Sequence, residues 1–323
     1  MNLSVPLVDV VGVGLNATDT LIGLPHFPAH NSKLEFRSAE VLPGGQVASS
    51  LVACQLWGLK SRYIGKVGDD AAAELQRREF ARAGVEAHLE RVQDCPSQQA
   101  FILVDQPTGE RTILWRRDSR LTIRPDELRQ EWITSARILL VDAHDTAAAA
   151  TAAGWAREAA IPTVADVDNI YPGLDSLLQV TDFLLASQTF PGRFTGDRDL
   201  PRALGAIARR FGCRVAGATL GHHGVLVCDA STPQTKMVSV PGFVVEVRDT
   251  TGAGDIFHAG FIFSWLRGDG IAGALEFACA AAALNCTQMG ARGAIRPVAE
   301  IEALMRTGQR HPPFPGLEGF HAV

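Results

Sequence analysis

The stretch DTTGAGD, residues 249–255, stands directly before Ile256–Leu266, an apolar segment long enough for a helix. Its glycines, Gly252 and Gly254, permit backbone angles and a close approach that side chains would block. The free N–H groups of a first helical turn point toward whatever binds there. A glycine-rich turn that opens a helix is therefore a candidate anion site, and phosphate is the ligand that fits it best.

Asp255 ends this stretch, and a carboxylate repels a neighbouring phosphate unless it has a task there. As a general base it would accept the proton of an attacking hydroxyl, while the backbone N–H groups of Gly252, Ala253 and Gly254 stabilise charge on the transferred phosphoryl group. We expect the positive end of the helix dipole to favour the ionised form of Asp255. The alternative is that Asp255 merely caps a helix.

Outward from this turn, Val-rich segments of strand length alternate with Ala-rich segments of helical length up to about residue 290. This alternation is typical of βα units, so we expect an α/β fold with a mostly parallel sheet. Strands are predicted at Val8–Gly14, Ser61–Val67, Ile138–Asp142, Pro162–Ala165, Phe183–Leu185 and Arg214–Ala218, and helices at Gln46–Trp57, Asp70–Ala83 and Thr146–Ala159. One main domain should cover residues 1–310, followed by an irregular Pro- and Gly-rich tail, 311–323.

Two segments break the alternation. Lys33–Leu42 has an approximate period of two, and Gln99–Arg117 is typical of a hairpin with its turn at Gln106–Gly109. Such strands could form a small separate sheet over one end of the main one. We therefore expect a lid built from about residues 17–43 and 98–118.

Composition narrows the class of partner. The 323 residues are 46% hydrophobic, and their formal charge of −5 comes without a long basic run, which argues against nucleic acid and anionic membranes as partners. The six cysteines form no C-x-x-C pair, so we expect reduced thiols rather than a zinc site or a disulfide framework. No stretch reaches the ~18 apolar residues of a membrane span, which favours the cytoplasm.

DTTGAGD followed by Ile256-Phe257 resembles the C-terminal signature of ribokinase-like (PfkB) carbohydrate kinases. Three further segments match family features in the expected order: Gly44-Gly45 before a helix, IGKVGDD at 64–70, and TLGHHG at 219–224 as a nucleotide-binding turn. The resemblance spans roughly residues 8–300. It implies a three-layer sandwich with a β-sheet lid, and an enzyme that uses ATP and Mg²⁺ to transfer the γ-phosphoryl group to a hydroxyl of a small sugar, with Asp255 as base.

The resemblance also implies binding residues. For the acceptor these are Asp19, Asn16, Gly44, Gly45, Gln46, Ser49 and Arg111, together with Asp255. For the nucleotide they are Ser187, Thr219, Gly221, Gly224, Gly252, Gly254 and Asn285. For a monovalent cation such as K⁺ they are Asp249, Thr251 and backbone carbonyls of the 285–294 loop. An ionised Asp19 suits a polyol because it accepts two hydroxyl hydrogens; the alternatives are a solvated loop Asp19 and a surface Arg111.

The sequence departs from the family pattern at several positions. Gln46 and Ser49 stand where many members have Asn, and residues 187–190 (SQTF) lack the Asn and Glu of an N-x-x-E element, so Mg²⁺ should be held mainly by nucleotide phosphates and water. Ketohexokinase-like and sulfofructose-kinase-like members show comparable departures, and GERTIL at 109–114 looks closest to them. This favours a ketose acceptor. A homodimer through the lid is a further expectation.

Two other functions compete with this one. Residues 12–17 (GVGLNA) fit the dinucleotide fingerprint G-x-G-x-x-A of nicotinamide-dependent oxidoreductases, but Gly23, Pro25 and Pro28 interrupt the region where its helix should follow. A non-catalytic sugar- or nucleotide-binding regulator of the same fold is the other candidate, against which the retained Asp255 argues. His144 follows a predicted strand end and is a candidate for substrate contact.

Overall fold

The computed structural model describes residues 7–232 and 234–315, and its centre is a nine-stranded sheet in the order β13-β12-β11-β10-β9-β8-β1-β4-β5. All neighbours from β11 to β5 pair in parallel, whereas β12 pairs antiparallel with both β11 and β13. The strands are β1 (Val10–Val13), β4 (Ser61–Val67), β5 (Glu86–Arg91), β8 (Ile138–Asp142), β9 (Thr163–Val167), β10 (Phe183–Ser187), β11 (Val215–Thr219), β12 (Val225–Asp229) and β13 (Lys236–Val240). The mostly parallel sheet is confirmed.

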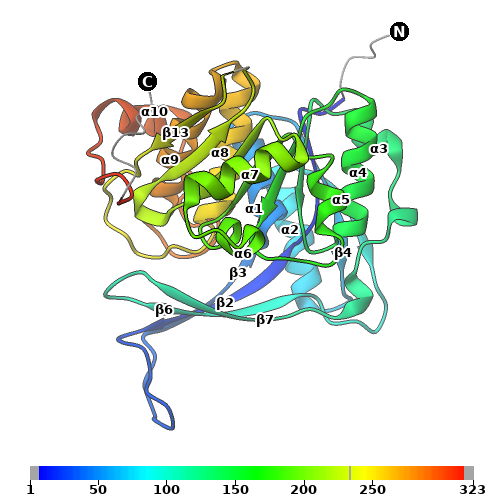
Figure 1. The fold of residues 1–323 in the computed structure, drawn as a ribbon. Coiled ribbons are helices and arrows are strands. Elements are labelled where there is room, and N and C mark those ends of the chain that lie inside the picture. The colour runs from blue at the N-terminus through cyan, green and yellow to red at the C-terminus, as the bar shows by residue number, and fades with distance from the viewer. Residues whose placement is uncertain (1–6, 233, 316–323) are drawn as a thin grey trace.

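Helices cover both faces of this sheet (Figure 1). They are α1 (Gln46–Leu56), α2 (Ala71–Ala83), α3 (Gln130–Thr134), α4 (Thr146–Glu158), α5 (Leu174–Leu178), α6 (Phe190–Thr195), α7 (Leu200–Phe211), α8 (Ala253–Arg267), α9 (Gly270–Asn285) and α10 (Val298–Thr307). Alternate strand residues enter two cores: Leu139 and Val141 pack with α4 and α7, whereas Ile138 and Leu140 pack with α1, α8 and α9. This is the expected three-layer sandwich, because successive strand side chains point to opposite faces.

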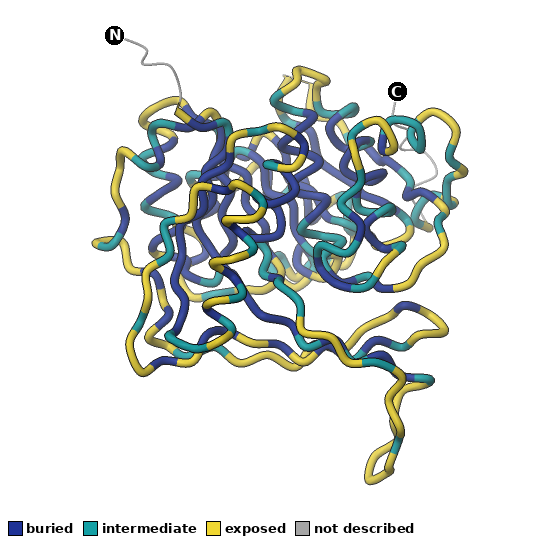
Figure 2. The backbone as a smooth tube through the Cα atoms, turned by 180° about the vertical axis from the view of Figure 1, so that it is seen from behind, coloured by how far each residue is buried: buried dark blue, intermediate teal, exposed yellow. Residues whose placement is uncertain are grey.

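A second sheet of four strands forms the lid, in the order β3-β2-β6-β7. Its strands are β2 (Ala17–Leu24), β3 (Ser38–Gly44), β6 (Gln99–Asp105) and β7 (Arg111–Arg116), which fall in the two segments expected from the sequence. In Figure 1 they run below the α/β body, and the loop between β2 and β3 projects from them. Figure 2 shows that loop as exposed. The expected strand Lys33–Leu42 is wrong in its first half, because pairing with β2 begins only at Ser38.

The pairing register decides what the lid presents to the body. Asp19 lies opposite Ala100, and Ala100 lies opposite Trp115, so these three side chains share one face of the lid sheet. The same face carries Ile102, which is buried, and its partner Ile113. The Trp115 ring lies 6.0 Å from that of His144, which follows β8, so this face of the lid is turned toward the body.

Several predicted boundaries agree with the structure, and the oxidoreductase alternative does not. Asp70 caps α2 by accepting a hydrogen bond from the Ala73 N–H, and Gly84 ends that helix in the left-handed conformation. After the G-x-G-x-x-A segment the chain enters strand β2 instead of a helix, so no helix N-terminus is available there for a pyrophosphate. All six cysteines are buried and unpaired, and no helix in the described ranges is long and apolar enough to cross a bilayer.

The division at residue 310 stays a prediction. His311 still donates its backbone N–H to the Gly242 carbonyl, and residues 316–323 of the expected tail lie outside the described part of the chain.

Candidate active site

The candidate site lies at the carboxyl ends of the parallel strands, where the chain passes from one side of β1 to the other. β1 pairs with β4 on one side and with β8 on the other, which is the topological switch point at which open α/β sheets bind ligands. Asp142 ends β8, and its carboxylate accepts a hydrogen bond of 2.6 Å from the Leu15 N–H after β1. Asp166 lies near the end of β9, in register with Asp142.

The turn 249–255 leads into α8 as a compact unit. Asp249 is fully buried, and its Oδ1 accepts hydrogen bonds from the Thr251 N–H (2.8 Å) and the Thr251 hydroxyl (2.6 Å). Gly252 has φ 73°, and a Cβ there would lie 2.3 Å from the Ala291 carbonyl oxygen, so only glycine fits. A Cβ on Gly254, in contrast, would meet no atom within 4 Å. The turn therefore leaves open space in front of Gly254, as an anion site requires.

Asp255 lies in the first turn of α8, which begins three residues earlier than the sequence suggested. No described residue donates a hydrogen bond to its carboxylate, whereas its backbone carbonyl accepts one from the Ser50 hydroxyl (2.8 Å). Burial, together with the neighbouring acids Asp166 and Asp19, raises the pKa of Asp255 to about 8. The helix dipole was expected to favour the ionised form of Asp255, whereas burial and the neighbouring acids act in the opposite direction.

Asp19 lies on β2, next to β3, the strand that leads into α1. It is only 5% exposed, which excludes the solvated-loop alternative. A Cβ on Gly44 would lie 1.9 Å from its Oδ2, so this carboxylate rests against the glycine backbone. Burial raises the pKa of Asp19 to about 6, against the opposing effect of the nearby Arg292.

Arg292 was not anticipated from the sequence. Its Nη2 donates to the Gly44 carbonyl (3.2 Å) and its Nε to the Ser49 hydroxyl (3.3 Å), while its buried Nη1 has no partner among the described residues. Burial lowers the pKa of Arg292 to about 10. Its charge lowers the pKa of Asp19, and a lone Arg after Gly290-Ala291 carries no signal that sequence spacing alone could read.

Asp166, together with Asp19 and Asp255, makes the centre of the site acidic, and His258 lies beside them. Gln46 donates its Nε2 to Asp166 (3.2 Å), and His258 Nδ1 lies 3.6 Å from Asp166 and 2.7 Å from the Gly254 carbonyl. Burial and the nearby Asp168 raise the pKa of Asp166 well above its usual range. Gln46 was predicted to bind the acceptor, and the structure adds that it is fixed by Asp166, an acid that sequence reasoning missed.

A family model for the pfkB family carbohydrate kinases matches residues 9–297, nearly the whole described chain. The chain belongs to this family. The resemblance drawn from the sequence and the enzyme class, carbohydrate kinase, are thereby confirmed. An ATP-dependent ribose-1-phosphate kinase of Halopiger xanaduensis is 30% identical over 303 residues, which cover 92% of this chain and 97% of that protein.

Solved structures of pfkB-type proteins share the fold. A putative ribokinase from Agrobacterium tumefaciens is 26% identical, with a TM-score of 0.85 over 93% of this chain and 97% of its own. A putative ribokinase II from Escherichia coli, solved in complex with ATP and Mg²⁺, has a TM-score of 0.78 at 19% identity over 93% and 99% of the two chains. The ATP and Mg²⁺ expected from the sequence are thus found in a protein with the fold of this kinase.

In this pfkB-family kinase the lid contacts the glycine turn. Arg111 of β7 donates its Nη1 to the Thr250 hydroxyl (2.8 Å), and the Thr250 hydroxyl and N–H both donate to the Gly109 carbonyl (3.1 and 3.3 Å). Arg111 is exposed but has a specific partner in the glycine turn, so its role at the acceptor stays a prediction. The β6–β7 hairpin, which carries Arg111, thus contacts Thr250, which lies between Asp249 and Thr251.

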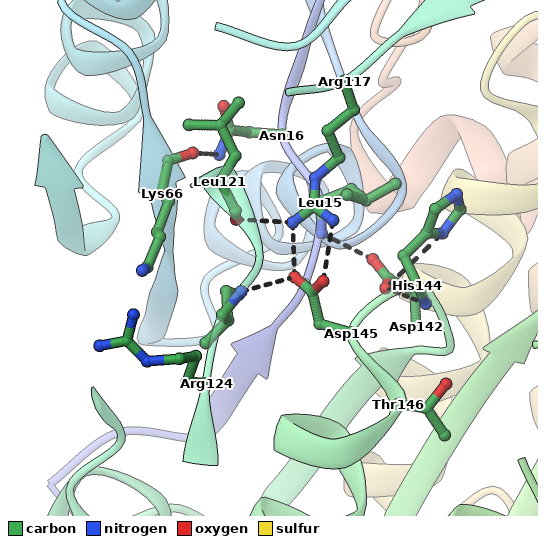
Figure 3. A network of polar contacts seen from close by, with 12 residues as sticks. Leu15, Asn16, Lys66, Arg117, Leu121, Arg124, Asp142, His144, Asp145 and Thr146 are labelled. Atoms are coloured by element: carbon green, nitrogen blue, oxygen red, sulfur yellow. Dashed lines mark hydrogen bonds and ion pairs between the residues drawn. The ribbon is translucent and has the colours of Figure 1, made fainter. Parts of the chain in front are cut away.

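The other end of the lid is fixed by a buried ion pair (Figure 3). Arg117, directly after β7, donates Nη1 to Asp145 Oδ1 (2.8 Å) and Nη2 to Oδ2 (2.5 Å), and Nη2 also donates to the Leu121 carbonyl (2.7 Å). Asp145 precedes α4 and also accepts a hydrogen bond from the Ile123 N–H (3.1 Å). This pair holds the lid beside Asp142.

The rings of His144, Tyr171 and Trp115 pack together beside the acidic residues of the site. The His144 Nε2 lies 2.9 Å from the Tyr171 hydroxyl, which donates to Asp168 Oδ1 (3.0 Å). Trp115 of the lid meets the His144 ring edge-on and is 58% exposed toward the space between lid and body. Trp115 was not among the predicted site residues.

The residues predicted to bind the nucleotide lie further along the same sheet edge. Ser187 and Thr219 are paired at the ends of β10 and β11, and Gly221 and Gly224 bound the short helical turn after Thr219. The Ser187 hydroxyl donates to the Asp168 carbonyl (3.2 Å). Within the described residues no group of three or more His, Cys, Asp or Glu side chains is arranged to hold a metal ion.

Three residues predicted to contact ligands need correction, because their side chains are buried and hydrogen-bonded within the protein. Asn16 is buried and donates to the Tyr63 hydroxyl (2.8 Å) and the Lys66 carbonyl (2.9 Å). Ser49 is fully buried and accepts from Arg292. Asn285 is fully buried as well, so its side chain is not free for a nucleotide. The roles predicted for Gly44, Gly45 and Gln46 stay predictions.

Proposed function

We propose that this protein is an ATP-dependent kinase that transfers the γ-phosphoryl group of ATP to a hydroxyl of a small sugar, with Asp255 as general base. One observation carries the proposal: a half-buried Asp255 carboxyl with a raised pKa and no partner among the described residues stands next to the open space before Gly254. A carboxylate with a raised pKa is a stronger base for a hydroxyl proton. The backbone N–H groups of 252–254 would hold the charge of the transferred group.

The remaining groups suit a sugar as acceptor. Asp19 can accept two hydroxyl hydrogens, and the exposed indole of Trp115 offers an apolar surface on the same face of the lid for the ring of the sugar. Arg292, with Nη1 unpartnered, is the nearby cation for an oxygen-rich ligand. These groups together provide polar contacts at the ring edge and packing on its face.

Two acceptor classes follow from independent observations. The lid segment GERTIL at 109–114 favours a ketose, whereas the name of the Halopiger relative favours ribose 1-phosphate. We place the ketose first, because the carboxylates of Asp19, Asp166 and Asp255 crowd the centre and favour an acceptor without a phosphate of its own.

An acceptor screen tests this function. The purified protein is incubated with Mg-ATP and fructose, ribose, ribose 1-phosphate or a nucleoside, ADP release is measured, and the phosphorylated hydroxyl is located by ³¹P NMR. We expect one sugar class to stimulate ADP release and to yield a phosphate ester. A phosphate ester formed only from the nucleoside would overturn the sugar assignment, and no product from any acceptor would contradict the kinase proposal.

A further inference from the structure

Asn285 joins the glycine turn to the loop 285–294. It is the last residue of α9 and is fully buried. Its Nδ2 donates to the Thr251 carbonyl (3.3 Å) and to the Ala291 carbonyl (3.2 Å), and its Oδ1 accepts from the Ala294 N–H (3.2 Å). Both N–H hydrogens of the amide therefore have partners inside the protein.

Two other oxygen-bearing groups of this region, the Asp249 carboxylate and the Gly290 carbonyl, also have protein donors. Asp249 receives its two hydrogen bonds from Thr251 on Oδ1, and its Oδ2 accepts from the Gly290 N–H (2.8 Å). The Gly290 carbonyl accepts from the Gly293 N–H (3.0 Å). Asp249 and the Gly290 carbonyl, two of the groups expected beside a monovalent cation, thus already accept hydrogen bonds from protein donors.

A bound cation and this amide exclude each other. A cation held by carbonyl groups needs several oxygens that converge on it in place of its hydration water. The Asn285 NH₂ group directs its hydrogens at two of those oxygens, Thr251 and Ala291, and its positive hydrogens would repel a cation between them. The amide hydrogens carry partial positive charge, so they stabilise the two carbonyl oxygens as a bound cation would.

We propose that the side-chain amide of Asn285 takes the place of a monovalent cation in this kinase, so that its activity does not depend on K⁺. The proposal rests on the proposed function, in which Gly252–Gly254 form the anion hole. Asn285 is then a positioning residue: it fixes Thr251, the residue before Gly252, against the Ala291 segment that packs on Gly252.

The wild-type protein gives the first test. Rates with the best acceptor and the thermal unfolding midpoint are measured in KCl and in tetramethylammonium chloride at equal ionic strength. We expect neither quantity to change with the cation. A K⁺-specific rise in either one would overturn the proposal, because a cation that binds the folded protein stabilises it. The midpoint requires no acceptor, so this result stands even if the kinase assignment fails.

Substitution at Asn285 gives the second test. Asn285→Asp places an oxygen where the amide donates, so the variant should unfold at a lower temperature in tetramethylammonium and recover part of the loss, and of its activity, in K⁺. Gln288→Glu adds the same charge at an exposed position of the loop and should show no K⁺ response. Asn285→Ala, which removes the amide without adding charge, serves where Asn285→Asp does not fold. Wild-type stability of both Asn285 variants without K⁺ would contradict the proposal.

Discussion

At the scale of single residues, the charge state of Asp255 is the property that matters most. Its surroundings are acidic and buried, and they raise its pKa to about 8, far above the value of a free aspartate. The raised pKa favours the protonated form of this group in the ligand-free enzyme. Ionisation must accompany substrate binding or follow a rise in pH.

The raised pKa predicts how stability depends on pH. Because the folded protein binds this proton more tightly than the unfolded chain, the stabilisation from Asp255 is complete below the unfolded pKa and is lost as pH rises through about 8. Asn cannot ionise, so the unfolding midpoint of Asp255→Asn relative to wild type should rise between about pH 5 and about pH 9. Thermal unfolding across this range measures it. A difference that stays constant with pH would show that the pKa of Asp255 is not raised.

Gly252 and Gly254 should respond differently to an added side chain. Gly254→Val should fold like wild type but lose phosphoryl transfer, because its side chain would enter the open space where the anion binds. Gly252→Ala should instead lower the unfolding midpoint, because φ is 73° and Ala291 blocks the Cβ. Circular dichroism melts and transfer rates on both variants separate the two effects. An active Gly254→Val enzyme would rule out this anion hole.

Asp19 should govern the affinity for the acceptor. Burial raises its pKa to about 6, and a protonated carboxyl accepts fewer hydroxyl hydrogens, so KM for the sugar should rise as pH falls through about 6. In Asp19→Asn this pH dependence should disappear and KM should be high throughout, with KM for ATP unchanged. Steady-state kinetics against both substrates tests this. An effect on ATP alone would place Asp19 at the opposite end of the site.

At the scale of elements, the lid depends on one buried ion pair. Asp145→Ala leaves the Arg117 charge without its carboxylate, with only the Leu121 carbonyl as partner, which should cost roughly 3–5 kcal/mol of folding free energy. Asp126→Ala, which breaks the exposed pair with Arg124, is the matched control and should change stability by less than about 1 kcal/mol. Chemical denaturation of both variants measures the difference. Equal, small losses would mean that the Arg117–Asp145 pair does not anchor the lid.

The elements that carry local signals were predictable from the sequence. α2 has its capping Asp70 and its terminal Gly84, and the parallel strands are short apolar runs between such helices. β2 was predicted only as part of the lid segment 17–43 and not as a strand with its own bounds. Its strand pairing comes from β3 and β6, which are distant in sequence, and that tertiary contact overrides the local pattern.

At the scale of the whole molecule, the glycine turn and Asp255 could be predicted from the sequence because they lie in one short motif. Arg292, Asp166 and Trp115 could not, because they reach the site only through the packing of the loop 285–294, the ends of the sheet and the lid register. The homodimer through the lid remains a prediction. Phe101 and Leu114, which are apolar and exposed and lie on the lid face that points away from Asp19, are where it would be sought.

The central claim is that Asp255 removes the proton from the acceptor hydroxyl, and single-turnover transfer from γ-labelled ATP in wild type and Asp255→Asn tests it most directly. Asn keeps the size of the side chain but cannot take up the proton. We expect unchanged ATP affinity, measured by calorimetry on the same preparations, and a transfer rate lower by roughly 10²–10⁴-fold, the usual contribution of a general base. Transfer at the wild-type rate in Asp255→Asn would contradict the account.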